Sequence, residues 1–386
     1  MGKRKLYRET NLLVVFGVTL MAVMGVATIT PAFPAMVREL NITTQEVGLL
    51  ITIFTIPGVF LAPVLGILAD RWGRKKILIP SLMIFGVVGG ACVLARDFHT
   101  LLALRFLQGT GAASIAFLNV TIIGDLYSGK QRIAAIGYNA GVLSVGTAGY
   151  PALGGAMAML GWYYPFLLPL VAIPIGFLAL HYLNNPEPDD GRSTRSYLKS
   201  IWRTIKNPQT VVLFIIGAST FLILYGAYLT FFPFMIASSF GGSALTIGMV
   251  MASTSLTTAL TAPQMGKLTK KRSGKTFLKI SFLLYALGLT MITVVPNIWL
   301  LMVPTIILGI AHGLNMPNLY ALLTRRAPME HRAAFMSING TALKLGQTLG
   351  PVLMGAVFTE WGLDSTFYVG SGMALMMFFL SAASLR

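Results

Sequence analysis

The sequence predicts an all-α membrane protein in which twelve transmembrane helices form two pseudo-symmetric six-helix bundles. Three observations predict this fold: the chain is strongly apolar, its apolar runs are long enough to cross a bilayer, and its two halves repeat each other. Charged residues make up 11% of the 386 residues and hydrophobic residues 55%, whereas a soluble domain carries about 25% charge. Because such a chain cannot cover a surface that faces water, lipid is its expected solvent.

The apolar runs define the expected spans, since a helix needs about 20 apolar residues to cross a bilayer. The spans are 11–31, 46–68, 77–95, 101–124, 133–156, 161–182, 209–236, 244–266, 276–294, 299–322, 333–358 and 365–384. The first run follows a basic start and resembles a signal peptide, but eleven further spans follow it, so we interpret it as a helix. We expect an N-terminal half at 1–183, a polar cytoplasmic central loop at 184–208 and a C-terminal half at 209–386.

The net charge of +17 is distributed unevenly between the two sides of the expected bundle. Of the 29 Lys and Arg residues, 25 fall in the N-terminus, the C-terminus and the loops of one side. This is the positive-inside pattern of a multi-pass plasma-membrane protein with both termini in the cytoplasm. The charge therefore indicates membrane topology and no nucleic-acid partner. The single Cys92 falls within a span, so no disulfide is expected.

The two halves repeat each other at a spacing of 200 residues. Gly66 pairs in this way with Gly266, Arg132 with Arg332, and Pro151 with Pro351. Duplicated membrane bundles commonly enclose a site that is exposed alternately to the two sides of the membrane. The repeat therefore favours transport by alternating access.

The loop between the second and third spans carries glycines, an acid and cations in a distinctive order. It reads Gly66-x-x-x-Asp70-Arg71-x-Gly73-Arg74-Lys75-Lys76. Glycine allows close backbone approach and a turn, while Asp70 at a helix end can pair with Arg74 or face the dipole of a neighbouring helix. Ordinary anchoring charge at the membrane surface is the alternative interpretation.

This loop resembles the signature loop of the major facilitator superfamily of transporters, and the resemblance extends over essentially the whole chain. It implies a latch that holds the halves together in the outward-facing state, in which Asp70 contacts helix 11 and Arg74 contacts an acid near helix 4. The expected latch residues are Gly66, Asp70, Arg71, Gly73, Arg74, Lys75 and Asp125. Lys270 replaces the acid in the second half, so one latch is expected.

Arg105 and Gln108 lie one turn apart in the fourth span, within the stretch Arg105-x-x-Gln108-Gly109-x-Gly111. A charged side chain at a helix centre costs about 2.5–3.5 kcal/mol, but snorkelling near the outer end reduces this cost. The stretch resembles the helix-4 motif of the family, which implies a role in proton movement or substrate binding. A structural arginine that forms hydrogen bonds is the alternative.

The fifth and eleventh spans carry glycine and proline at matching positions. These are Gly137, Gly146, Tyr150, Pro151, Gly154 and Gly155 in the fifth span and Gly346, Gly350 and Pro351 in the eleventh. Small residues four apart let helices pack closely, which predicts seams between helices 5 and 8 and between helices 11 and 2. The pattern resembles the helix-5 signature of drug exporters, with Tyr150 in place of the glycine before Pro151.

Lys344 lies eleven residues into the eleventh span, about 16 Å along a helix and therefore near the midplane. Ionisable residues in membranes usually line a pathway, so Lys344 is a candidate cation of the substrate cavity. Snorkelling or bonds to backbone carbonyls are the alternative. Thr341 and Gln347 share the face of Lys344, and His312 in the tenth span would lie close to the same depth, so these join Arg105 and Gln108 as candidates for the substrate or proton pathway. Tyr225, Tyr228 and Asn315 are weaker candidates.

No Asp or Glu falls deep within an expected span, whereas proton-coupled exporters of lipophilic cations usually need a buried carboxylate. The family resemblance implies a proton-coupled secondary exporter of multidrug-efflux type, and the absence of a buried carboxylate favours a small neutral or anionic organic substrate. An organic-anion importer or exchanger and a lipid flippase on the same scaffold are the alternatives. No enzymatic activity, cofactor or metal is expected, and the protein should act as a monomer in the bilayer.

Overall fold

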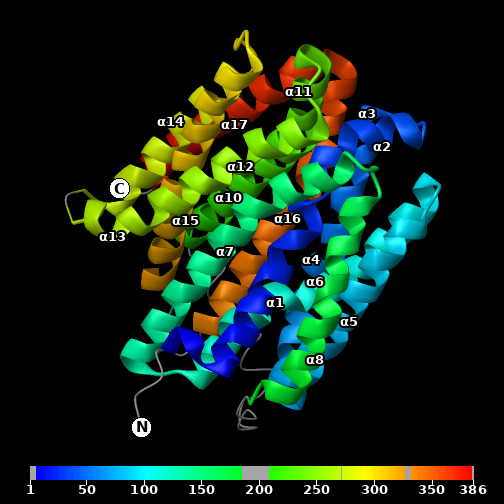
Figure 1. Ribbon diagram of the computed structural model, residues 1–386. Helices are drawn as coiled ribbons and strands as arrows, with labels where there is room; N and C mark the ends of the chain where they lie inside the picture. The colour runs from blue at the N-terminus through cyan, green and yellow to red at the C-terminus, as the bar shows by residue number, and fades with distance from the viewer. Residues whose placement is uncertain (1–5, 185–207, 271, 327–331, 385–386) are drawn as a thin grey trace.

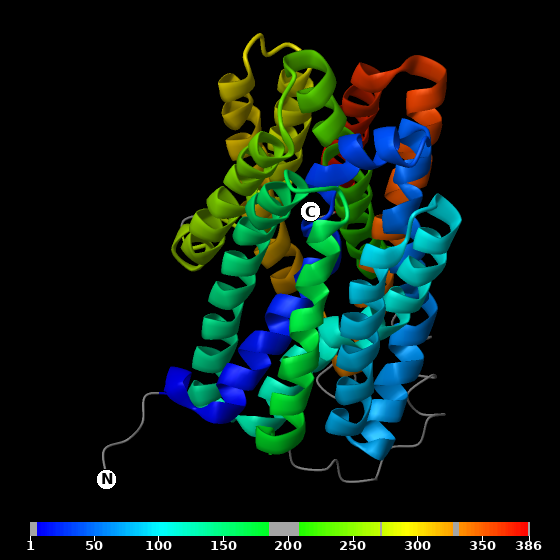
Figure 2. The same ribbon diagram turned by 45° about the vertical axis from the view of Figure 1, so that its right-hand side comes forward.

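The computed structural model describes residues 6–184, 208–270, 272–326 and 332–384, and these ranges contain helices and no strand (Figures 1 and 2). Most of the expected central loop at 184–208 lies outside the described residues, so the boundaries between the halves stay a prediction.

The first half consists of six membrane-crossing segments, four of which are interrupted. In order they are α1 (Thr10–Ala27) with η2 (Thr30–Ala32) and α2 (Phe33–Glu39); α3 (Thr44–Val47) with α4 (Leu49–Trp72); α5 (Arg74–Ala91) with η3 (Cys92–Leu94); α6 (Phe98–Leu126); α7 (Gly129–Ala158); and η4 (Tyr164–Val171) with α8 (Ala172–Tyr182). A short helix, η1 (Leu6–Arg8), precedes α1.

The second half follows the same plan. Its segments are α10 (Pro208–Ile223) with the π-helical η5 (Leu224–Phe231) and α11 (Phe232–Phe240); α12 (Ala244–Thr261) with η6 (Ala262–Gln264) and α13 (Met265–Leu268); α14 (Gly274–Ile292); η7 (Ile298–Leu301) with α15 (Met302–Arg326); α16 (Arg332–Trp361); and α17 (Leu363–Ser384).

These twelve segments confirm the predicted fold. Ten of the described segments are long and apolar enough to cross a membrane, and α7 and α16, of 30 residues each, complete the twelve. The helices extend beyond the predicted spans by polar turns; α15, for example, continues to Arg326. Hydropathy marks the part of a helix that lies in lipid, while its hydrogen bonds extend further.

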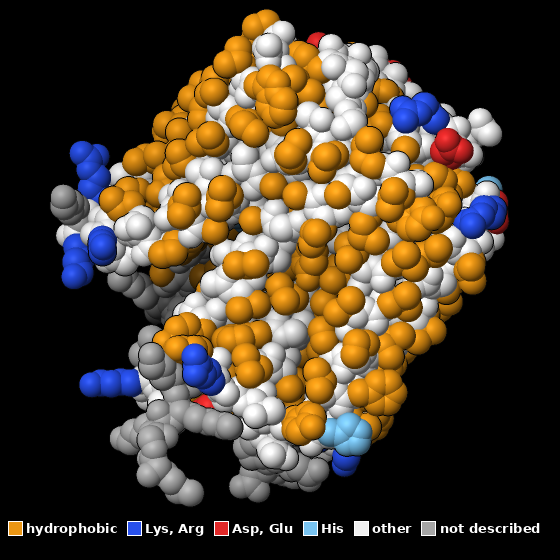
Figure 3. Space-filling view, in the orientation of Figure 1, with side chains coloured by type: hydrophobic (Ala, Val, Ile, Leu, Met, Phe, Trp, Pro, Cys, Tyr) orange, Lys and Arg blue, Asp and Glu red, His pale blue; other side chains and the backbone are white. Residues whose placement is uncertain are grey.

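Each half has its own hydrophobic core. One cluster joins buried residues from Leu12 to Leu183 and includes Phe234 of the second half, and the other joins residues from Leu213 to Met377. Large apolar side chains also cover the flank of the molecule, where Figure 3 shows a hydrophobic surface with most Lys and Arg side chains at its edges. Such an extensive apolar surface is that of a protein surrounded by lipid.

Two ends of the bundle can be distinguished by charge. We call the end that carries Arg74, Lys75, Lys130, Arg132 and Lys267 the basic end, and the other the opposite end. The two seams between the halves, α4 with α16 and α7 with α12, are packed at the opposite end. There Gly48 packs against Pro351, and Gly248 packs against the carbonyl oxygen of Pro151.

The seams are open toward the basic end. The buried residues of α4 run from Leu50 to Gly58 and then resume only at Ala69, and those of α12 end at Thr254. A Cβ added at Gly137 or Gly141 of α7 would meet nothing within 4 Å. In Figures 1 and 2, α13 lies apart from the start of α7. The halves therefore meet at the opposite end and separate at the basic end.

Candidate functional site

The predicted latch residues meet at the basic end of the first half. Arg74 begins α5 directly after Gly73, whose positive φ of 103° favours glycine. The Arg74 guanidinium lies 2.7 Å from Asp70 Oδ1 and 2.9 Å from Asp125 Oδ2, and its Nη1 donates to the carbonyl of Ala69 at 3.2 Å. One largely buried cation thus links the ends of α4, α5 and α6.

Asp70 remains 63% exposed beside this cation. Its expected partner, helix 11, begins near Arg332, where the side chains lie outside the described ones, so that contact stays a prediction. Gly66 is loosely packed, with Phe117 3.9 Å from the place of a Cβ. Asp70 thus pairs with Arg74 through Oδ1 while most of its side chain stays exposed.

Arg105 is fully buried within the first half and does not face the opening. Its guanidinium donates to Gln108 Oε1 at 2.6 Å and to the backbone carbonyls of Gly25 at 2.8 Å and Leu50 at 3.3 Å. Its Cζ also lies 4.0 Å from the ring centroid of Phe54, a cation–π distance. These contacts tie together α1, α4 and α6 and favour the structural role left open by the sequence.

Gln108 continues this buried network. Its Nε2 donates to the carbonyl of Phe85 in α5 at 3.5 Å, and Gly89 lies so close to the Gln108 amide that a side chain there would collide with it. The sequence pattern located these residues correctly on one helix face, but their enclosure depends on carbonyls of other helices.

The seam between α4 and α16 contains a ladder of threonines. Thr52 donates to the carbonyl of Thr348 at 3.0 Å, and the hydroxyls of Thr55 and Thr348 lie 3.0 Å apart. One turn nearer the basic end, the Lys344 side chain crosses to α4: a Cβ at Gly58 would lie 3.2 Å from its Cδ and 3.4 Å from its Cε. Lys344 therefore lies where the closed part of the seam ends.

Two polar groups beside this point lack protein partners. Lys344 Nζ has no hydrogen-bond or ion-pair partner within the described part of the chain. Gln347, one turn further along α16, is 8% exposed, and its Oε1 is buried without a partner among those residues. Thr341 of the same helix is partly buried.

The second half contributes an aromatic cluster that includes His312. Tyr285 Oη lies 2.7 Å from His312 Nδ1, and the Phe221 ring meets the imidazole edge-on at 6.2 Å between centroids. Phe221 in turn packs against Tyr225 at 5.8 Å. The cluster joins α10, η5, α14 and α15, and the π-helical turn of η5 lies within it. Such π segments occur frequently at functional sites.

Tyr228 and Asn315 are held in buried hydrogen bonds of the same half. The Tyr228 hydroxyl lies 2.7 Å from Thr254 Oγ1 of α12, while Asn315 Nδ2 donates to Ser281 Oγ of α14 at 3.0 Å. With exposed fractions of 3% and 0%, respectively, these two side chains are packing elements in the described conformation.

The glycine and proline motifs lie in the seams and within the halves. Gly154 meets the backbone of Thr28, Gly155 that of Ala244, Gly346 that of Ala218, and Gly350 that of Leu222 and Gly226. Gly146 packs against Leu20, and Tyr150 and Pro151 are buried. The predicted seams of helix 5 with 8 and helix 11 with 2 are both present.

Sequence reasoning missed a buried polar cluster in the first half. Asn119 Nδ2 donates to Thr19 Oγ1 at 3.0 Å, and that hydroxyl donates to Asn139 Oδ1 at 2.6 Å. Single Thr and Asn residues in apolar spans carry no periodic signal. The repeat does mark a different buried polar pair of the first half. Ser81, whose hydroxyl bonds to Ser114 at 2.6 Å, corresponds to Ser281 at a spacing of 200 residues.

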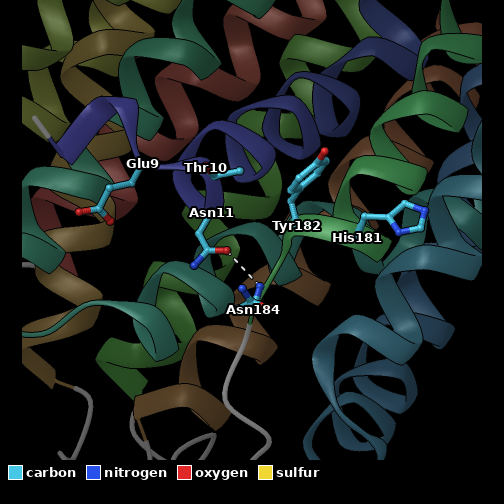
Figure 4. Close-up of a pocket in the computed structure, with 6 residues that line it drawn as sticks. All are labelled: Glu9, Thr10, Asn11, His181, Tyr182 and Asn184. Atoms are coloured by element: carbon cyan, nitrogen blue, oxygen red, sulfur yellow. Dashed lines mark hydrogen bonds between the residues drawn. The ribbon is translucent and has the colours of Figure 1, made fainter. Parts of the chain in front are cut away.

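A separate pocket of about 370 Å³ lies at the basic end between α1 and α8 (Figure 4). Its lining residues are Glu9, Thr10, Asn11, His181, Tyr182 and Asn184. The backbone of Asn184 donates to Asn11 Oδ1 at 3.0 Å. Tyr127 Oη donates to Glu9 Oε2 at 3.0 Å, and partial burial raises the pKa of the Tyr127 hydroxyl. These bonds join the start of α1 to the residues that follow α6 and α8 at the basic end of the first half.

Comparisons with known proteins agree with this architecture. The bacillibactin exporter of Bacillus subtilis (strain 168) is 27% identical to the chain, over 91% of it and 90% of the exporter. Multidrug resistance protein 2 of the same organism is 25% identical, over 91% and 89%. A solved structure of nucleoside transporter NupG covers 97% of this chain and 100% of its own, with a TM-score of 0.81 at 14% identity.

The family model described as Major Facilitator Superfamily matches residues 15–241 and 219–386 and thus spans both halves. The chain therefore belongs to the major facilitator superfamily and is a multi-pass membrane transporter.

Proposed function

We propose that this transporter exports a small organic compound across the plasma membrane by alternating access, coupled to proton antiport. The observation that carries the proposal is the asymmetry of the seams, which are packed at Gly48 and Gly248 and open toward Gly137 and Gly141. The positive-inside pattern favours a cytoplasmic basic end. The described conformation is then the one that takes up substrate from the cytoplasm. The relatives named as exporter and multidrug resistance protein support the direction.

The repeated seams support alternation between two such states. Contacts such as Gly248 with Pro151 close the opposite end, while Gly137 and Gly141 have room to be approached by α12 when the basic end closes. Rocking of one repeat against the other around a central site is the usual mechanism of duplicated transporters. The Arg74 cluster would then hold the basic end closed in the outward-facing state.

The charge of the spans supports neutral or anionic substrates. Within the described ranges, the acids Glu46, Asp70, Asp125 and Asp364 lie at helix ends, whereas Lys344 lies within the bundle. A buried unpaired carboxylate, the usual partner of a cationic substrate, has no counterpart in the described spans.

His312 is our candidate for the group that carries the coupling proton. Histidine is the side chain whose ordinary pKa lies nearest neutral pH. Tyr285 bonds to Nδ1 of the imidazole, so the coupling proton would bind at the other ring nitrogen, Nε2. An organic-anion importer or exchanger is the second candidate function, and the unpaired Lys344 ammonium favours it because such a carrier needs a fixed positive charge.

The decisive experiment uses inside-out vesicles with an acid interior and an acid-sensing dye. We expect addition of a neutral or anionic substrate to release protons, and His312→Asn to abolish the release. Transport of an anion without proton release, and faster when a second anion is preloaded, would support the exchanger instead. Absence of transport for neutral, anionic and cationic compounds, with folded protein inserted, would contradict both functions.

A further inference from the structure

Lys344 lies at the boundary between the closed and the open part of the seam of α4 and α16. On its outer side, the seam is closed by the hydrogen bonds of Thr348 with Thr52 and Thr55. On its inner side, α4 has no buried residue from Val59 to Leu68. The side chain thus lies at the closed end of an opening that widens toward the basic end.

Glycine at position 58 sets the path of this side chain. The Cδ and Cε of Lys344 lie 3.2 and 3.4 Å from the position of a Cβ on Gly58. A larger residue on α4 would occupy the space through which the methylene chain crosses. The alkyl stem is therefore packed between the halves, while the ammonium has no partner of its own among the described residues.

Gln347 gives a second and independent sign of a missing ligand. Its side chain is more than nine-tenths buried, and its Oε1 has no hydrogen-bond partner in the described part of the chain. Residues three apart on a helix are neighbours on its surface, so the amide lies beside Lys344. A buried polar group without a partner costs about 1–3 kcal/mol, and a bound molecule that pairs with it would offset that cost.

Among the described residues, no carboxylate pairs with the ammonium. The described acids nearest to α16 in sequence, Glu360 and Asp364, lie at or just beyond its end at Trp361. From Lys344 to Glu360 is 16 residues, about 24 Å along the helix. Over such a distance neither acid pairs with Nζ, so within the described residues the ammonium is left to pair with a negatively charged ligand.

We propose that Lys344 and Gln347 form an anion-binding subsite for the transported compound, with Gly58 as the residue that positions the lysine. The ligand is an organic anion of carboxylate or phenolate type with a polar group next to the charge. Lys344 donates to the anionic oxygen, and the Gln347 amide, which can both donate and accept, pairs with the neighbouring polar group. This inference names the substrate class of the proposed transporter and rests on that function.

The test measures binding to the purified full-length protein, so that it depends neither on transport direction nor on protons. The probes are 2-naphthoate, the uncharged isostere 2-naphthamide and the cation 2-naphthylmethylammonium. In the wild-type protein we expect the carboxylate to bind at least tenfold more tightly than the amide, and the cation to bind most weakly. Equal affinities for carboxylate and amide would overturn the proposal.

Variants then assign the preference to the subsite. Lys344→Gln should remove the preference for the carboxylate, and Lys344→Arg should retain it. Gly58→Val, which leaves the charge in place but blocks its path, should weaken carboxylate binding at least threefold with little effect on the amide. Lys130→Gln, which removes an exposed cation at the start of α7, is the matched control.

The outcomes separate this inference from the proposed function. Loss of the carboxylate preference in Lys344→Gln, with monodisperse protein that still binds the amide, supports the subsite. An unchanged preference in both Lys344→Gln and Gly58→Val would show that the charge acts elsewhere, even if proton-coupled export of a neutral compound is established in vesicles. Conversely, the binding result stands if the vesicle experiment reveals exchange.

Discussion

Pro151 and Gly248 are in contact across one seam between the halves, and the same contact recurs across the other seam with the roles of the halves exchanged. The carbonyl oxygen of Pro151 occupies the space of a side chain at Gly248, and Pro351 Cβ lies 3.2 Å from the place of a Cβ at Gly48. The two prolines are 200 residues apart in the sequence, and so are the two glycines. Each half supplies a proline to one seam and a glycine to the other, so the two seams are expected to open and close together.

The first prediction concerns this contact. Gly248→Ala would place a methyl group against the Pro151 carbonyl, where the backbone cannot easily move aside. We expect the opposite end to open more often and transport to fall at least tenfold, with the protein still inserted. Distances between spin labels on η4 and η7 would report the opening. Gly372→Ala on α17, where a Cβ meets nothing within 4 Å, is the matched control and should be close to wild type.

The second prediction concerns the basic end. Asp70→Asn and Asp125→Asn each remove one of the two charges that face Arg74. If this cluster stabilises the outward-facing state, both variants should lower transport about tenfold and increase the share of molecules open at the basic end. Asp364→Asn, at the opposite end, serves as control. Normal transport by both variants would assign Asp70 and Asp125 to anchoring at the membrane surface.

The fold was largely predictable because membrane helices obey strong local rules. Apolar runs and the basic loops fix the number and the order of the spans, and the repeat of Gly66 and Pro151 divides them into halves. These signals depend on composition and spacing, which do not require knowledge of the partner helix. The seams were predictable for the same reason, since Gly155 and Pro351 mark helix faces that pack closely on the other half.

The site was less predictable because its properties depend on neighbours from distant parts of the chain. Arg105 has the same sequence signal whether it lines a cavity or bonds the carbonyls of Gly25 and Leu50. The importance of Gly58 follows only from Lys344, 286 residues away. A pattern can locate a polar residue at a depth in the membrane, but the second helix decides whether that residue is free to bind a ligand.

The third prediction separates structure from transport at Arg105. Lysine cannot reach Gln108 and the carbonyls of Gly25 and Leu50 at once, so Arg105→Lys should lose two of these three bonds. Bonds to charged groups contribute about 1.5–3 kcal/mol each, so we expect a stability loss of at least about 3 kcal/mol. A thermal unfolding assay in detergent should show a melting temperature lower by several degrees. A variant as stable as wild type but inactive in transport would instead place Arg105 in the proton or substrate pathway.

The last prediction concerns the coupling proton. His312→Asn keeps a polar side chain near Tyr285 but removes the imidazole that would bind the coupling proton. If His312 carries the proton, the variant should still exchange substrate between equal pools but should no longer accumulate it when a pH gradient is imposed. Substrate accumulation by the variant should be at least tenfold lower than by the wild type, while the rate of exchange should differ by less than threefold. His99→Asn at the exposed start of α6 is the control. Accumulation that survives in His312→Asn would move proton coupling to another residue, and loss of both exchange and accumulation would assign His312 to the substrate-binding cluster with Phe221 and Tyr225.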